Sequence, residues 1–321
     1  MIYTRKKFKI IFSQVLNEWL DNKTAKVNIT TSSKYRSLSE LYIKPKLGMI
    51  LFKKINEQDI YNFFQEENIC KLSDSTKKTI YTIINSVIKY GTGKLYRKKI
   101  IKFEIKFKPP KIRIEYLTKK EQYILEEYLK NNLNLRNLCI LFDLYTGLRI
   151  GELCALQWKD IDFINSTVSI NKTVKRIKNI NKEINKKTLL ILDKPKSESS
   201  VRIVPVPTFL IDLLKKFEND NKDFFIFTNS IKPKDPRSLE KYFSNVLNKC
   251  NIKNIVFHSL RHTYATRSRE AGIDIKILSE LLGHSSYKVT LDIYVHTPFD
   301  FKKDSVKSLV NYLSTQKFIE L

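Results

Sequence analysis

The chain has 321 residues, of which 42% are hydrophobic and 29% are charged, a composition typical of a soluble globular protein long enough for two domains. Its apolar runs hold only a few residues, which excludes a membrane-spanning helix of about 18, and the N-terminus lacks the apolar core of a secretion signal. Lysine and arginine number 59 against 33 aspartate and glutamate, a net charge of +26, which favours nucleic acid as a partner over the alternative, a basic surface reflecting a lysine-rich genome.

The first hundred residues predict a small helical domain. Apolar residues recur at helical spacing in four segments, 10–20, 32–43, 56–67 and 75–91. We expect the second helix to stop before Pro45 and Gly48, Asn56 to cap the third, and Gly91 to end the fourth. Residues 1–116 carry 25 basic and 10 acidic side chains, a net charge of +15, so this part of the chain is the more basic one.

A basic segment follows at residues 89–113, with ten basic side chains and one acid, Glu104. Its alternating run "KFEIKFKPP" predicts an extended chain rather than a helix. One interpretation is a solvated linker. The other is a strap along a phosphate backbone, in which four side chains contact DNA; these strap lysines are Lys98, Lys99, Lys102 and Lys106.

The remainder predicts a second domain that is mainly α-helical with one small antiparallel β-sheet, an α+β fold. Thr118 and Glu121 match a capping box at its first helix, Gly147 ends the next, and Arg149 stands at the entrance of another. The period then changes to that of strands in three segments, 167–177, 188–194 and 200–207, with a polar hairpin loop at 178–187. Helices return from residue 207 to the end.

All four histidines lie in the last 64 residues, and a metal site is one explanation to exclude. His258 and His262 share a helix face, but a zinc protease requires a glutamate directly after the first histidine, where this chain has Ser259. Arg261 between them would repel a divalent cation. The four scattered cysteines form no CxxC pair and are expected to be free thiols. We therefore predict no metal and no cofactor.

Metal-free attack on a DNA phosphodiester has three chemical requirements. Fixed guanidiniums must stabilise the charge that develops on the non-bridging oxygens. A lysine or histidine must protonate the leaving oxygen, and a nucleophile must conserve the bond energy as a covalent intermediate. Each candidate alone has an ordinary structural explanation, but the second domain holds the complete set in order: Arg149, a lysine of "DKPKSESS", His258, Arg261, His284 and Tyr294.

This ordered set resembles the tyrosine recombinase (phage integrase) family, in particular the integrases of conjugative transposons and temperate phages. "TGLRIGEL" is similar to the family's first arginine motif, "HSLRH" to its H-x-x-R box, "LLGHSS" to its second histidine motif, and "LDIYVH" to its nucleophile motif. "PKSESSVRIVPVP" resembles the hairpin with the catalytic lysine, assigned by alignment to Lys196, with Lys194 as the alternative. His262 is expected to pack behind the site, and His296 receives no role.

The resemblance implies a site-specific recombinase that needs neither metal nor ATP. Tyr294 would attack the scissile phosphate and form a 3′-phosphotyrosyl link, while Arg149 and Arg261, assisted by His284, hold the non-bridging oxygens. Lys196 would protonate the leaving oxygen, and His258 would manage the proton of the tyrosine. A type IB topoisomerase shares this chemistry and is the nearest alternative; a non-catalytic basic DNA-binding protein is the alternative from another class.

The resemblance also implies an organisation and partners. We predict a helical core-binding domain at 1–100, a basic linker at 101–116 and a catalytic domain at 117–321, with no separate arm-binding domain before them. The expected partners are the core sites of double-stranded DNA, accessory DNA-bending factors and three further copies in a synaptic homotetramer. The free protein is expected to be a monomer. It would act in the cytoplasm of a bacterium, at the nucleoid. A tail helix at about 304–316 would dock on a neighbouring protomer or pack on its own domain.

Overall fold

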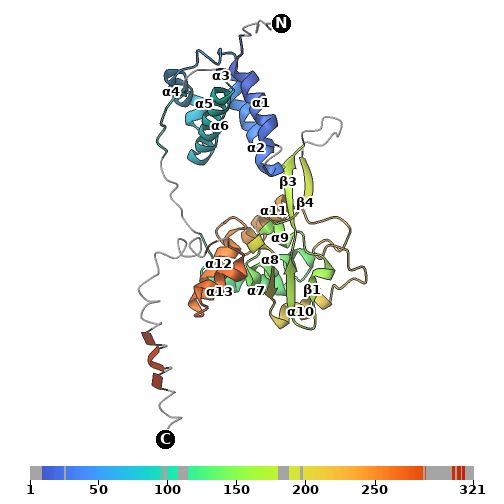
Figure 1. The fold of residues 1–321 in the computed structure, drawn as a ribbon. Coiled ribbons are helices and arrows are strands. Elements are labelled where there is room, and N and C mark those ends of the chain that lie inside the picture. The colour runs from blue at the N-terminus through green and yellow to red at the C-terminus, as the bar shows by residue number, and fades with distance from the viewer. Residues whose placement is uncertain are drawn as a thin grey trace. The chain divides into compact units, whose positions relative to one another are not determined.

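The computed structural model divides into two compact units (Figure 1). Each unit has its own hydrophobic core. The first comprises Met1–Ile112 with Ile177–Lys187, and the second comprises Arg113–Arg176 with Thr188–Leu321. The residues that the structure describes are 9–24, 27–94, 96, 100–107, 115–179, 188–195, 198–284, 286, 306–307, 309–311 and 313–314.

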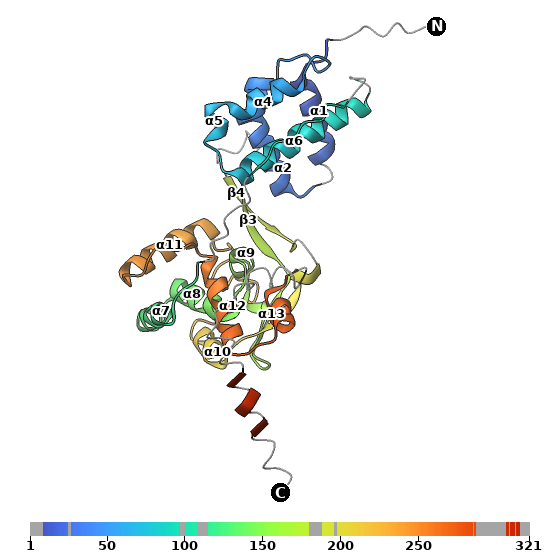
Figure 2. The same ribbon diagram turned by 90° about the vertical axis from the view of Figure 1, so that its left-hand side faces the viewer.

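The first unit is a helical bundle whose core is formed by the apolar faces that the sequence predicts. Its α-helices are α1 (Phe12–Thr24), α2 (Ile29–Leu38), α3 (Lys44–Leu47), α4 (Glu57–Gln65), α5 (Glu67–Cys70) and α6 (Asp74–Gly93) (Figure 2). The side chain of Asn56 accepts the Asp59 N–H at 3.1 Å and Asp59 reciprocates, which confirms Asn56 as the cap of α4. Along α6, the apolar side chains that recur at helical spacing are buried: Ile80, Ile83, Ile84, Val87 and Ile88.

The second predicted helix is longer than expected, because Pro45 does not stop it. Between α2 and α3 the chain forms one π-helical stretch, Ser39–Ile43, in which the Lys44 N–H reaches back to the Ser39 carbonyl. This wider turn restarts the helix, so that Pro45 falls in the first turn of α3, where a missing N–H costs nothing.

Gly91 does not end α6 but lies buried within it, two residues before the last helical residue. A Cβ atom at this position would lie 2.3 Å from the ring of Phe52 and 2.9 Å from Val15. The absence of a side chain therefore lets α6 approach α1 and the chain after α3 closely, a packing role rather than a terminating one.

The described part of the basic segment, residues 100–107, is extended, as predicted. Alternate side chains (Ile101, Phe103, Ile105 and Phe107) pack against the core of the first unit, and the Tyr81 hydroxyl donates to the Phe103 carbonyl at 3.2 Å. Lys102 and Lys106 point the other way and are exposed. The chain is thus fixed here while its lysines face solvent.

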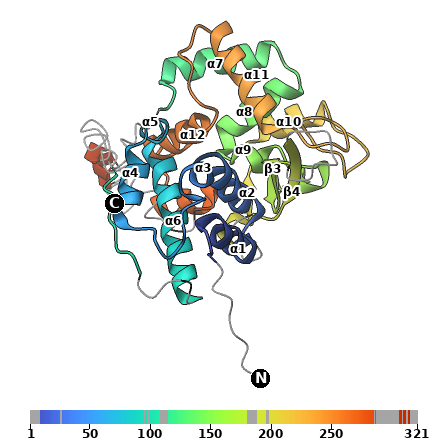
Figure 3. The ribbon, with the colours of Figure 1, turned by 90° about the horizontal axis from the view of Figure 1, so that it is seen from above.

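The second unit is built around α8, which is buried along most of its length and packs against α7, α10 and α12 (Figure 3). Thr118 and Glu121 cap α7 reciprocally, at 3.2 Å and 2.8 Å, as predicted. The helices are α7 (Lys119–Asn131), α8 (Leu135–Thr146), α9 (Ile150–Leu153), α10 (Thr208–Lys215), α11 (Pro236–Lys249), α12 (Ser259–Glu270) and α13 (Ile275–Leu282).

The strands form two small sheets rather than the single one predicted. The first is antiparallel, in the order β1 (Ile161–Asp162), β2 (Thr167–Ile170) and β5 (Arg202–Pro205); the second pairs β3 (Thr173–Lys178) with β4 (Thr188–Asp193). The chain changes sheet at Lys172, whose ammonium is held by Asp160 at 2.8 Å and by Gln157 at 2.7 Å. The predicted fold class, mainly α with small antiparallel sheets, is confirmed.

The described residues of the C-terminal tail are helical. Their apolar side chains share one face and are 55–61% exposed; they are Val306, Leu309, Val310 and Leu313. Within the described residues this stripe therefore has no core to pack on. None of the helices described in either unit has the length and apolar character that crossing a membrane requires.

Candidate active site

The first candidate residue, Arg149, is positioned by the tight turn that ends α8. Gly147 adopts a left-handed conformation, with φ of +60°, and its N–H donates to the Asp143 carbonyl at 2.8 Å. The turn leaves no room for a side chain, since a Cβ atom on Gly147 would lie 2.4 Å from the ring of Tyr264. Two residues later Arg149 begins α9, as predicted, with its side chain partly exposed.

Three arginines converge on the C-terminal end of α13, where helix carbonyls lack intrahelical partners and the helix dipole is negative. Arg149 donates to the Gly283 carbonyl at 2.7 Å and Arg261 to the Leu282 carbonyl at 2.8 Å. The third, Arg202 at the start of β5, donates to the Leu281 carbonyl at 2.7 Å. This helix end therefore holds the guanidiniums in a fixed arrangement.

Glu152 provides the counter-charge of the arginine cluster. It is only 3% exposed and forms ion pairs with Arg149 at 2.8 Å and with Arg202 at 3.0 Å. Burial alone would raise the pKa of the Glu152 carboxyl, but the two arginines outweigh it and hold that pKa below its usual value. The carboxylate thus stays ionised, and the three arginines and Glu152 together carry two excess positive charges.

Arg261 is the deepest of the candidate residues, only 3% exposed, on the first turn of α12. Its second terminal nitrogen donates to the Gly147 carbonyl at 2.9 Å, so that it connects the turn after α8 with the end of α13. Burial, and then the charge of Arg149, lower the pKa of Arg261, yet a guanidinium remains protonated at any physiological pH.

Two histidines border the arginines. His258 precedes α12, and His284 follows Gly283, with its backbone N–H on the Ser279 carbonyl at 3.1 Å. Burial and then Arg261 lower the pKa of His284 to about 4. Burial, and then the charges of His262 and Arg261, lower the pKa of His258 to about 4 as well. Both rings are neutral at pH 7.

His262 packs behind His258, as expected. The two rings meet edge to face, with centroids 4.8 Å apart and planes at 83°. Burial and then Arg261 lower the pKa of His262, so it too is neutral at pH 7. No group of three or more histidine, cysteine or acidic side chains suited to a metal ion occurs among the described residues.

The sequence pattern of the phage integrase family matches residues 115–300, and that of the phage integrase N-terminal SAM-like domain matches residues 11–67. The chain belongs to the phage integrase family. A tyrosine recombinase XerC-like protein of Caldanaerobacter subterraneus subsp. tengcongensis is 30% identical over 298 residues, covering 86% of this chain and 74% of that protein. The integrase of Staphylococcus phage L54a is 26% identical over 322 residues, covering 89% of each.

The fold is also that of a solved integrase. This chain is similar to the structure of the Tn1549 transposon integrase in complex with a circular intermediate DNA. The match covers 94% of this chain and 99% of that chain, with a TM-score of 0.72 at 20% identity. The resemblance stated from the sequence motifs is thereby confirmed, and the chain is a tyrosine recombinase of the transposon and phage type. The topoisomerase and non-catalytic alternatives are not favoured.

The structure brings four of the six predicted catalytic residues of this integrase together: Arg149, His258, Arg261 and His284. Lys196 and Tyr294 lie outside the described residues, as do His296 and two strap lysines, Lys98 and Lys99. Lys194, the alternative to Lys196, is exposed just after β4.

Sequence reasoning missed two members of the integrase cluster, Glu152 and Arg202. Glu152 stands three residues after Arg149 at the start of a helix, a spacing at which side chains meet, so the sequence did hold a signal. Arg202 belongs to the segment "PKSESSVRIVPVP", from which only the catalytic lysine was assigned. Nothing in the local sequence indicates that its side chain crosses to α13, because that contact depends on the tertiary fold.

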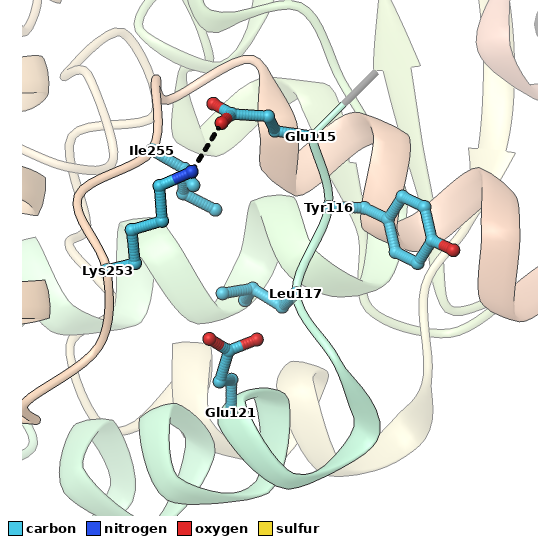
Figure 4. A pocket seen from close by; sticks show the side chains of 6 residues that line it. All are labelled: Glu115, Tyr116, Leu117, Glu121, Lys253 and Ile255. Atoms are coloured by element: carbon cyan, nitrogen blue, oxygen red, sulfur yellow. Dashed lines mark hydrogen bonds and ion pairs between the residues drawn. The ribbon is translucent and has the colours of Figure 1, made fainter. Parts of the chain in front are cut away.

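A small pocket of the second unit lies elsewhere, where the chain enters α7 (Figure 4). Its lining comprises Glu115, Tyr116, Leu117, Glu121, Lys253 and Ile255. Glu115 and Lys253 form an ion pair at 2.8 Å beside it, and Glu121 is engaged in the cap of α7. The pocket includes no candidate catalytic residue.

Proposed function

We propose that this integrase exchanges DNA strands at specific core sites through a 3′-phosphotyrosyl intermediate and so integrates or excises a mobile element. The observation that carries the proposal is the convergence of Arg149 and Arg261 on the end of α13, beside two neutral histidines. A phosphodiester gains negative charge on its non-bridging oxygens when a fifth oxygen attacks. Guanidiniums fixed beforehand stabilise that charge without reorganising.

The proposed proton transfers follow from the charge states. Because His258 is neutral at pH 7, its ring accepts a proton from the hydroxyl of Tyr294 as that oxygen attacks phosphorus. His284, also neutral, keeps one ring N–H to donate to a non-bridging oxygen. Lys196 supplies the proton to the departing 5′ oxygen. The 5′-hydroxyl of the partner duplex then attacks the phosphotyrosyl bond and releases Tyr294, so no ATP is consumed.

The experiment that tests this function uses a nicked suicide substrate, which loses its short 5′-hydroxyl strand after cleavage and traps the enzyme on DNA. We expect a covalent adduct that forms in EDTA. Two further incubations, one with two duplexes and one with supercoiled plasmid, distinguish a recombinase from a topoisomerase. Exchange of strands between the duplexes supports the proposal. Relaxation of the plasmid with no exchange between the duplexes contradicts it. Binding of the DNA without any adduct would indicate a non-catalytic DNA-binding protein.

We further propose that the enzyme works as a homotetramer in which each C-terminal tail docks on a neighbouring protomer. Exchange between two duplexes cleaves four strands and therefore needs four active sites. The exposed stripe of the tail supports the proposal, since four apolar side chains left in water favour burial against a partner. Truncation after Thr297 should leave binding of a single site intact and abolish the tetramer; a truncated protein that still assembles would contradict it.

The basic segment is proposed as the DNA strap. Its described part supports this, because the backbone of 100–107 is anchored by apolar side chains while Lys102 and Lys106 face solvent. The place of action would be the bacterial nucleoid, the source of double-stranded core sites, with DNA-bending factors as accessory partners.

A further inference from the structure

Arg202 occupies a buried junction between three parts of the second unit. The side chain is 7% exposed. Its guanidinium donates to the Leu281 carbonyl at 2.7 Å, to the Ser200 carbonyl at 3.0 Å and to the Glu152 carboxylate at 3.0 Å. Each of its three nitrogens has a different acceptor, and the three acceptors come from α13, from the turn before β5 and from α9.

Two of these contacts lead to members of the candidate active site. Glu152, held by Arg202, forms its other ion pair with Arg149 and so helps to fix the position of that guanidinium. Leu281 immediately precedes the carbonyl that holds Arg261, and His284 follows two residues later.

The junction is shaped for a guanidinium. Gly283 has φ of +65°, and a Cβ atom there would lie 2.8–3.1 Å from the guanidinium of Arg202. The planar group therefore packs directly on the backbone of the α13 cap. Lysine has a single nitrogen on a flexible stem and cannot present three donors in one plane to three separate acceptors.

We propose that Arg202 is a positioning residue for strand cleavage, which aligns Arg149 and the α13 end on one phosphate. Its donors are directed at protein acceptors, and it acts through them. The inference rests on the proposed function, because it concerns the rate of the cleavage step.

The test compares Arg202→Lys and Arg202→Met with a matched control, Arg267→Met. Arg267 lies on α12 and also binds a carbonyl, that of Leu117 at 2.6 Å, and a carboxylate, that of Glu270 at 2.8 Å, but no candidate catalytic residue. Adduct formation on the nicked substrate is measured in a single turnover, and DNA affinity separately. Displacing reacting groups by about 1 Å costs on the order of 100-fold in rate.

We expect Arg202→Met to lower the cleavage rate on the order of 100-fold, Arg202→Lys to recover only part of it, and both to keep wild-type DNA affinity. Arg267→Met should cleave at the wild-type rate. Cleavage by Arg202→Lys at the wild-type rate would overturn the proposal, and this variant also decides the matter if Arg202→Met does not fold. Absence of any adduct from the wild-type protein would instead overturn the proposed function.

A second readout separates positioning from general support of the fold. If Arg202 acts on the phosphate through Glu152 and Arg149, adding Arg202→Lys to Arg149→Lys should cost much less in cleavage rate than it costs in the wild type. Fully multiplicative losses would show that the two arginines act independently, which contradicts the proposed route.

Discussion

Replacing Glu152 by glutamine removes one negative charge and preserves the shape of the side chain. Arg202 then remains buried without its counter-ion, and Arg149 loses one as well. Removing one partner of a buried ion pair costs about 3–5 kcal/mol. The lower end applies, because Arg149 is 37% exposed and its pair is screened by solvent. We therefore expect the second unit to lose about 3 kcal/mol, or roughly 6–12 °C in Tm for about 200 residues.

Thermal and urea unfolding followed by circular dichroism measure this loss. The matched control is Glu218→Gln, which breaks an ion pair with Lys222 at 2.6 Å whose side chains are 36% and 50% exposed. Such a surface pair contributes at most about 1 kcal/mol. A Glu152→Gln protein as stable as the Glu218→Gln protein would refute the claim that Glu152 is the counter-ion of the arginine cluster.

The pH dependence of the same pair of proteins provides a further check. The pKa of Glu152 is lower in the folded protein than in the unfolded chain, because burial is outweighed by Arg202 and Arg149. Its stabilising contribution is therefore complete above the unfolded pKa of about 4.3 and is lost as pH falls through the lower folded value. The stability difference between wild type and Glu152→Gln should shrink in that acid range; a difference that grows on acidification would contradict the assignment.

Three more predictions concern packing, the leaving group and DNA affinity. Gly91→Ala should destabilise the first unit by about 1–3 kcal/mol in urea unfolding, whereas Gly93→Ala, where a Cβ atom meets nothing within 4 Å, should not; equal losses would contradict the packing role. Lys196→Ala should slow cleavage of a normal substrate and be largely rescued by a 5′-bridging phosphorothiolate, whose sulfur leaves without a proton; rescue of Lys194→Ala instead would move the assignment by two residues. Neutralising the four strap lysines should weaken DNA binding and flatten its salt dependence by a slope of about 0.9 for each phosphate that the protein no longer neutralises, and an unchanged slope would return the segment to a solvated linker.

Local periodicity was sufficient to predict most helices of the fold, because most of them bury one face in their own unit. The apolar stripe of α6 and the caps at Asn56 and Thr118 are properties of neighbouring residues and can be read from the sequence. The position of Gly91 against Phe52 joins segments 39 residues apart in the chain. Whether this glycine ends a helix or packs within one is decided by that distant ring, which the local sequence does not contain.

In the candidate site, too, the sequence predicts some features and the tertiary fold decides the others. The family's sequence motifs predicted four site residues that the structure brings together around the end of α13: Arg149, His258, Arg261 and His284. They did not indicate what holds the arginines in place. That task falls to backbone carbonyls and to Glu152, and a carbonyl acceptor has no signature in the sequence because every residue carries one.

The identity of the residue joined to DNA decides whether this integrase uses Tyr294 as its nucleophile. Wild-type protein and Tyr294→Phe are incubated with the nicked substrate in excess EDTA, and any adduct is digested and mapped by mass spectrometry. We predict that the wild type carries the 3′-phosphate on Tyr294, while Tyr294→Phe binds the same DNA and forms no adduct. An adduct on another tyrosine, such as Tyr287, or one that forms only when magnesium or zinc is restored, would contradict it.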